Sequence, residues 1–161
     1  MKKIFTQFVL FVLFVLLGSL SVNAETLQAG VSVNEIPKDF FGSWQIVGSL
    51  EKTNSPKTFK GKSSDYWNLS RKGDVLYLEN PLNGANAEVS IDNVEGNLVT
   101  FTRKVAYDNN KVLTDTVTLR IDGNKFSGLN NLKLEHYSLV DNHLMKTDTA
   151  LYKIIGNKYA N

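Results

Sequence analysis

The stretch VLTDTVTLRIDGNKFSG, residues 112–128, decides the fold. It begins with a run rich in Val, Thr, Leu and Ile, and such residues favour β-strands. The run ends at Asp122-Gly123-Asn124, three residues that tolerate the positive φ of a tight hairpin turn. A second apolar segment starts at Phe126. The stretch therefore predicts two strands joined by a short turn.

The same alternation of short apolar runs and turn clusters continues on both sides of this hairpin. Its regular spacing is typical of an all-β domain. Nine strands are predicted: Ser43–Glu51, Asp65–Ser70, Val75–Leu78, Ala87–Val94, Leu98–Ala106, Val112–Ile121, Phe126–Gly128, Asn131–Leu139 and His143–Ile155. One short helical turn is predicted within Ile36–Phe41, behind Pro37.

The short connections between these runs favour antiparallel neighbours, because parallel pairing needs long crossover segments. The fold class predicted is thus all-β, an antiparallel meander of about eight to nine strands. Closure into a small barrel would remove the exposed strand edges and enclose a side-chain core or one small ligand. A two-sheet β-sandwich is the alternative architecture.

The first 24 residues have the three zones of a secretory signal peptide. Two lysines precede an apolar core at residues 8–17, and Val22 and Ala24 occupy the −3 and −1 positions before a cut after Ala24. Ten apolar residues are too short a run to span a bilayer, so no stable membrane anchor is expected after cleavage. The predicted organisation is a signal peptide (1–24), a weakly structured lead-in (25–35) and one domain (36–161), exported to a bacterial periplasm or to the medium.

Charge and cysteine content narrow the function classes. The chain has 18 basic and 16 acidic residues, and two of the lysines lie in the signal peptide, so the mature part is formally neutral. Its lysines are spread along the chain, whereas nucleic-acid binding calls for a clustered basic face. No cysteine is present, which excludes disulfides, thiolate metal sites and lipid attachment at a cysteine.

The segment Phe40–Val47, FFGSWQIV, and the segment Thr147–Ile155 together resemble the first and last strands of calycin-type barrels, the lipocalins and fatty-acid-binding proteins. In that resemblance Gly42 lets the chain turn into the first strand and Trp44 plugs the closed end of the barrel. Lipocalins usually stack an arginine on this tryptophan from near the last strand. This sequence has Lys153 there, so the arginine would come from another strand, as Arg103 or Arg120.

The resemblance implies a barrel that binds a small hydrophobic or amphipathic ligand. Five aromatic residues on predicted strands are the candidate ligand-binding residues, and they either line a cavity or fill a solid core: Trp44, Trp67, Tyr77, Phe101 and Tyr152. The segment Thr53–Ser64 and its surroundings gather four lysines that would steer an anionic head group or form a plain solvated loop: Lys52, Lys57, Lys60 and Lys62.

No catalytic constellation is evident. His136 and His143 flank a predicted turn, which leaves open whether they face each other or are unrelated. Paired catalytic carboxylates could be drawn from three acids, but each lies among turns or at a solvent-facing position: Asp65, Glu79 and Glu135. We therefore predict no enzyme, no metal and no cofactor. Two functions remain: a barrel that binds a small ligand, or an interaction or inhibitor module that binds an unknown protein partner through its loops.

Overall fold

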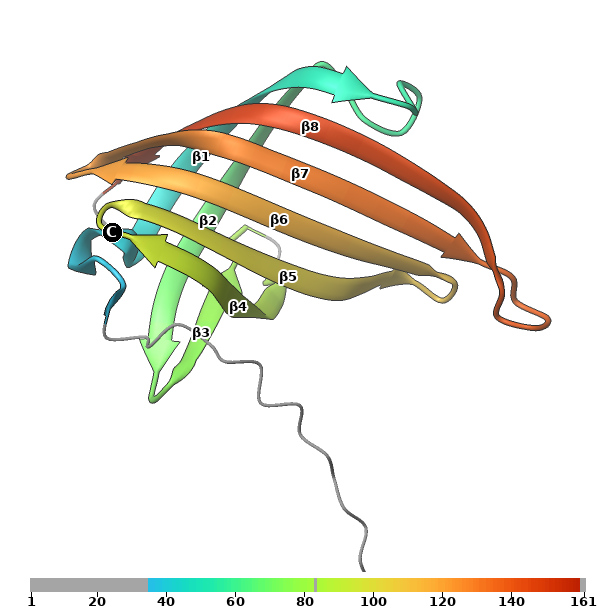
Figure 1. Cartoon of the computed structure of the whole chain (residues 1–161), viewed down its shortest axis with the longest axis horizontal. Helices are drawn as coiled ribbons and strands as arrows, with labels where there is room; N and C mark the ends of the chain where they lie inside the picture. Colours follow the sequence, from blue (N-terminus) through green and yellow to red (C-terminus); the bar gives the residue numbers. More distant parts are fainter. Residues whose placement is uncertain (1–34, 83, 160–161) are drawn as a thin grey trace, which may run out of the picture.

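The computed structural model describes residues 35–82 and 84–159. Eight antiparallel strands follow one another as a meander, and β8 pairs with β1, which closes the ring of hydrogen bonds into a barrel (Figure 1). The strands are β1 (Gly42–Thr53), β2 (Lys62–Lys72), β3 (Val75–Glu79), β4 (Asn86–Glu95), β5 (Leu98–Asp108), β6 (Lys111–Asp122), β7 (Lys125–Tyr137) and β8 (Leu144–Lys158). The predicted signal peptide, and the lead-in through residue 34, lie outside the described residues.

The predicted all-β meander is confirmed, and its closure into one ring leaves no separate second sheet as the sandwich alternative requires. The one error in strand number concerns β7, which was predicted as two strands, Phe126–Gly128 and Asn131–Leu139. Asn130 does not interrupt the strand, because its neighbours in register, Val117 on β6 and Tyr152 on β8, continue the pairing on both sides. The predicted helical turn is the 3₁₀ helix η2 (Lys38–Phe40), preceded by Pro37.

The hairpin that decided the fold forms as predicted. Asp122 pairs with Lys125 across the β6–β7 turn, and Gly123 has a φ of 54°. Asn142 in the β7–β8 turn has a φ of 56°. Both values lie in the left-handed region that glycine and asparagine adopt at lower cost than other residues. These turns give the two hairpins their tight reversals.

We call the end of the barrel that carries η2, the β6–β7 turn and the end of β8 the closed end (Figure 1). Trp44 is fully buried there, and its Nε1 donates to the carbonyl oxygen of Phe40 in η2 at 3.0 Å. The ring of Phe126 lies 4.9 Å from that of Trp44 and stacks on Trp67 at 6.2 Å. Phe101 also packs edge-on against Trp67. This aromatic core fills the closed end.

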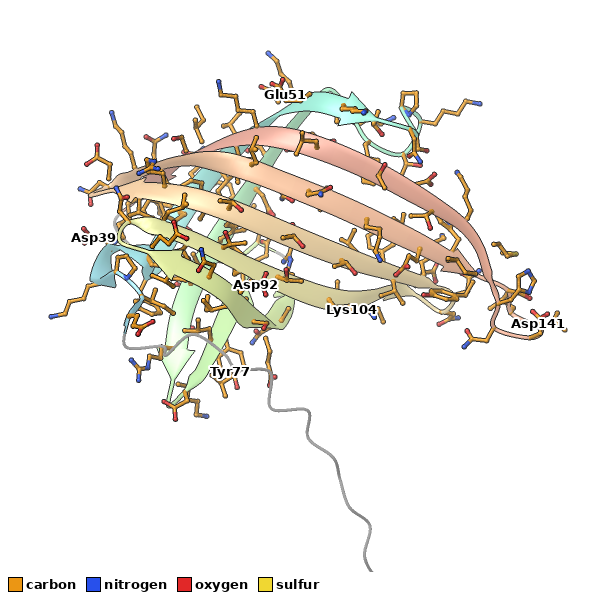
Figure 2. The ribbon with its side chains drawn as sticks, viewed as in Figure 1. Asp39, Glu51, Tyr77, Asp92, Lys104 and Asp141 are labelled. Atoms are coloured by element: carbon orange, nitrogen blue, oxygen red, sulfur yellow. The ribbon has the colours of Figure 1, made fainter. Side chains whose placement is uncertain are left out.

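The opposite end, which we call the open end, carries the β1–β2 loop, the β5–β6 turn and the β7–β8 hairpin. The β7–β8 hairpin projects beyond the neighbouring strands, with Asp141 at its tip (Figure 2). Four large apolar side chains of this hairpin are exposed: Leu139, Val140, Leu144 and Met145. The two ends of the barrel therefore differ in character, one filled by aromatic rings and the other formed by loops.

Candidate functional site

A cavity of about 220 Å³ lies in the barrel between the aromatic core and the open end. Most of the side chains around it belong to the inward-facing series of β1, β2, β5, β6, β7 and β8, because alternate residues of a strand point to the same face. Its lining is Ile46, Ser63, Ser64, Asp65, Trp67, Arg103, Leu113, Asp115, Asn130, Leu132, Tyr152 and Ile154. The exposed Ser63 and Ser64 mark its rim.

One wall of the cavity is polar and buried. Arg103 Nε donates to Asp115 Oδ2 at 2.8 Å, and the Asp115 side chain is only 1% exposed. Burial raises the pKa of Asp115 above its ordinary value, while the Arg103 guanidinium and a hydrogen bond from the Asn130 side chain to this carboxylate act in the opposite direction. Asp115 Oδ1 and the nearby Asn130 Oδ1 have no hydrogen-bond partner among the described residues. Two acceptors in the cavity wall are thus unsatisfied.

A second carboxylate in the lining, Asp65, is satisfied by neutral donors. Its Oδ2 accepts from Trp67 Nε1 at 2.9 Å, and its Oδ1 accepts from Asn80 Nδ2 at 2.6 Å and from the Tyr66 backbone N–H at 2.9 Å. These bonds hold the Trp67 indole in place but do not cancel the charge of Asp65. The cavity lining therefore contains two acidic side chains and one guanidinium.

The remaining wall is apolar. The Trp67 side chain, 2% exposed, separates the cavity from the aromatic core on which it stacks. Aliphatic side chains complete this wall: Ile46, Leu113, Leu132 and Ile154. Binding pockets for small molecules commonly combine a mostly apolar lining with a few placed polar groups. This cavity has that composition.

The β1–β2 loop, residues 54–61, is tied to the barrel beside the cavity. Tyr152 Oη donates to the Lys60 carbonyl oxygen at 2.8 Å, and Asn54 Nδ2 donates to the Thr147 carbonyl oxygen at 3.0 Å. Thr58 Oγ1 donates to Asp148 Oδ2 at 3.4 Å. The lysines predicted to steer a ligand are exposed, and none lines the cavity: Lys52, Lys57, Lys60 and Lys62.

The five aromatic residues predicted to bind a ligand are divided among three places. Trp67 and Tyr152 line the cavity. Trp44 and Phe101 are fully buried in the aromatic core and do not line it. Tyr77 lies on β3 between the inward-facing Leu76 and Leu78, so its side chain is on the outer face (Figure 2). The structure therefore brings two of the five to the cavity.

Comparison with known proteins finds no family model, no curated protein and no solved structure that matches this chain. The case for a function accordingly rests on the geometry of the described residues.

The cation that lies over Trp44 is Lys158, and none of the three residues considered from the sequence takes that place. Lys158 Nζ lies 5.1 Å from the centre of the Trp44 ring and also donates to the Asp39 carbonyl oxygen at 3.0 Å. Lys153 is exposed on the outer face. Arg120 donates to Asn97 on the outside of the barrel, and Arg103 is engaged with Asp115 at the cavity. The alternation of β8 explains the result, because 158 and 153 have opposite parity along the strand.

The two histidines do not form a joint site. His136 Nε2 lies 3.1 Å from Asp148 Oδ2, whereas His143 Nδ1 lies 2.6 Å from Asp141 Oδ1. A hydrogen bond from Lys146, aided by His136, keeps the pKa of Asp148 below its ordinary value. Residues 35–82 and 84–159 contain no group of three or more His, Asp or Glu placed to hold a metal ion. Nor do they contain a helix long and apolar enough to cross a bilayer.

The three acids considered as catalytic carboxylates lie in different surroundings. Asp65 lines the cavity. Glu135 Oε1 accepts a hydrogen bond from Lys133 Nζ at 3.1 Å. Glu79 ends β3 and pairs in register with Asn68. The structure therefore gives no reason to treat them as a catalytic set.

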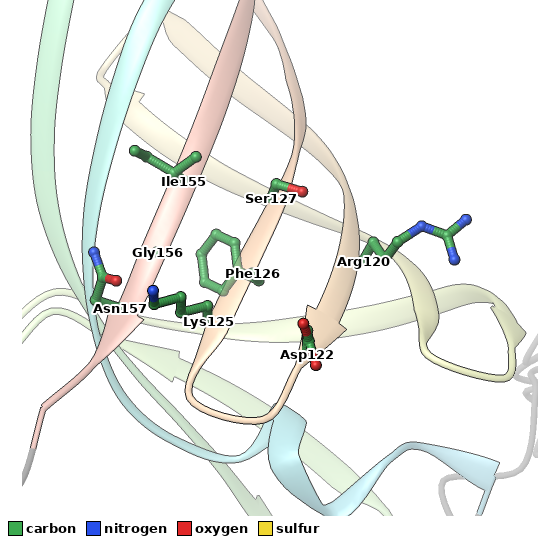
Figure 3. Close-up of a pocket in the computed structure, with 8 residues that line it drawn as sticks. All are labelled: Arg120, Asp122, Lys125, Phe126, Ser127, Ile155, Gly156 and Asn157. Atoms are coloured by element: carbon green, nitrogen blue, oxygen red, sulfur yellow. The ribbon is translucent and has the colours of Figure 1, made fainter.

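A larger depression, of about 430 Å³, lies at the closed end of β6, β7 and β8 (Figure 3). In Figure 3 the guanidinium of Arg120 points away from Ile155 and Lys125, toward the β4–β5 turn, where it bonds Asn97 at 3.1 Å. None of the buried unsatisfied polar atoms found among the described residues belongs to its lining. The smaller internal cavity is therefore the better candidate.

Asp115 and Asn130 are the site residues that the sequence interpretation missed. Each occupies an inward position in a series that is otherwise mostly apolar, as in Leu113, Asp115 and Val117 on β6. A polar residue at a core position is rare unless it is paired or functional. This break in the alternation was the available signal.

Proposed function

We propose that this chain is an exported barrel that binds a small amphipathic molecule in its internal cavity. The observation that carries the proposal is the composition of that cavity: an aromatic and aliphatic wall faces a buried polar wall with two unsatisfied acceptors. The signal peptide predicted from residues 1–24 supplies the export. The resemblance to calycin-type barrels belongs to the same proposal and is supported by the closed ring of eight strands and by Trp44 at the closed end.

The polar wall gives a physical reason for a ligand. Leaving a buried hydrogen-bonding group unsatisfied costs about 1–3 kcal/mol. A bound molecule that donates to Asp115 Oδ1 and Asn130 Oδ1 recovers this energy, and its apolar body gains from contact with Trp67 and Leu132. The volume of about 220 Å³ lies below the roughly 300–1,000 Å³ of pockets for drug-sized ligands. A compact ligand is therefore favoured over a long acyl chain.

The test is a thermal-shift screen of the mature protein against compact amphipathic compounds, with two matched variants. Leu132→Phe fills the cavity, and Leu129→Phe places the same change on the outer face of the same strand. Compounds that stabilise the wild type and Leu129→Phe, but not a folded Leu132→Phe, support the proposal. Equal shifts in both variants, or no stabilising compound, would contradict it.

A second candidate function is an interaction module, and the exposed tip of the β7–β8 hairpin favours it. Leu139 and Val140 are 77% and 97% exposed, and two more apolar side chains lie beside them. Exposed clusters of apolar side chains commonly mark sites of protein association. A photo-crosslinking residue at Val140 would capture the same protein partner repeatedly from the exported fraction, whereas one at the exposed Lys72, where β2 ends at the closed end, would not. Identical capture from both positions would exclude this candidate.

A further inference from the structure

We propose that the molecule bound in the cavity is a small organic amine, whose ammonium group is held by Asp115 Oδ1 and Asn130 Oδ1. This inference rests on the proposed function and specifies the class of ligand. Both acceptors belong to side chains at least nine-tenths buried, and both line the same cavity. An ammonium group carries three donors and no acceptor, so it can serve two acceptors at once.

The charges around the cavity select a cation over an anion. With all groups ionised, Asp65 and Asp115 contribute two negative charges and Arg103 contributes one positive charge. Arg103 already donates to Asp115 Oδ2, so an anion at this guanidinium would lie beside the Asp115 carboxylate and in the same cavity as Asp65. A protonated amine instead meets a net negative lining when Asp115 is ionised, and its positive charge favours that ionised form against the effect of burial. In a poorly solvated site such charge pairing is stronger than in water.

The apolar wall restricts the rest of the ligand. Trp67 offers an aromatic surface, and Leu132 and Ile154 offer aliphatic surface. A ring or short branched hydrocarbon joined to the amine fits this lining. Benzylamine, benzyl alcohol and benzoate are therefore suitable probes, because they share one ring and differ in the polar group.

The experiment is calorimetric titration of the mature wild-type protein with these three probes. We expect benzylamine to bind at least about tenfold more tightly than benzyl alcohol, because hydrogen bonds to a charged group are worth more than neutral ones. We expect no measurable binding of benzoate. The comparison needs no variant, so it remains decisive even if changes at Asp115 impair folding.

Two substitutions test whether Asp115 is responsible for the preference for the amine. Asp115→Asn should reduce the affinity for benzylamine about tenfold or more and leave benzyl alcohol nearly unchanged. Asp148→Asn, which alters a buried carboxylate outside the cavity lining, should leave both affinities unchanged. Equal binding of the amine and the alcohol, or tighter binding of benzoate, would overturn the assignment of an amine while leaving a ligand-binding cavity in place. Failure of all three probes, together with a negative compound screen, would overturn the proposed function as well.

Discussion

Replacing Gly156 by alanine tests the packing of the closed end. Gly156 lies opposite Phe126 in the β7–β8 register, and a Cβ added to it would lie 2.3 Å from two ring carbons of Phe126. Such a separation is far inside van der Waals contact, so the ring must move. The ring is itself confined by Trp44 at 4.9 Å and by Trp67 at 6.2 Å. The added methyl group therefore disturbs the whole aromatic core.

Overpacking a well-filled core typically costs about 1–3 kcal/mol. For a domain of this size, that corresponds to a melting temperature lower by about 4–12 °C. Urea denaturation and thermal melting, followed by circular dichroism, measure both quantities. Gly61→Ala is the matched control, because a Cβ there meets no atom within 4 Å, and its effect should stay within about 0.5 kcal/mol.

A double variant makes this prediction more specific. Phe126→Leu removes the ring that the new methyl group would strike, so the double variant with Gly156→Ala should lose less stability than the two single losses added together. A Gly156→Ala protein as stable as the wild type would refute this account of the packing. So would additive losses in the double variant, because they would show that Gly156 and Phe126 do not interact.

Three further results are expected. Tyr152→Phe removes the hydrogen bond to the Lys60 carbonyl oxygen in the β1–β2 loop, so it should lower the free energy of unfolding by about 0.5–1.5 kcal/mol and speed amide hydrogen exchange in that loop. Unchanged exchange would show that this hydrogen bond does not hold the loop. Because the hydrogen bond from Lys146 lowers the pKa of Asp148, the carboxylate stabilises the fold above its ordinary pKa of 3.8, and this stability is lost as the pH falls through the lowered value. In Asp148→Asn the free energy of unfolding should therefore fall less steeply as the pH is lowered through the acid range. An unchanged pH dependence would show that the Asp148 carboxylate does not contribute to stability. Lys158→Met should lower stability by about 0.5–1 kcal/mol and change the fluorescence of Trp44, whereas an unchanged spectrum would argue against the cation–π contact.

Much of the fold could be predicted because its signals are local. Turn residues such as Gly123 and Asn142 adopt the positive φ values that their residue types favour, and the apolar runs between the turns became strands. The division of β7 failed for the opposite reason. Asn130 resembles a turn residue by composition, but pairing with β6 and β8 keeps it within a strand, and this depends on residues distant in the sequence.

The cavity was less accessible to prediction from the sequence. Four of the five predicted aromatic residues lie inside the barrel, but their residue type does not reveal which of them fill the closed end and which line the cavity. Tyr77 shows the limit, since only the register of β3 against its neighbours places it outside. The pairing of Arg103 with Asp115 depends on the alignment of β5 and β6, which composition does not determine.

The central claim, that the cavity binds a small ligand, is tested most directly by the two tryptophan indole signals in a ¹⁵N-resolved NMR titration with benzylamine. Trp67 lines the cavity, and its Nε1–H donates to Asp65, whereas Trp44 is enclosed in the aromatic core and donates to Phe40. The account predicts a saturable shift of the Trp67 signal, accompanied by the side-chain amide of Asn130, with the Trp44 signal nearly unchanged. A titration that leaves Trp67 and Asn130 unmoved, or that shifts only residues on the outer face, would contradict it.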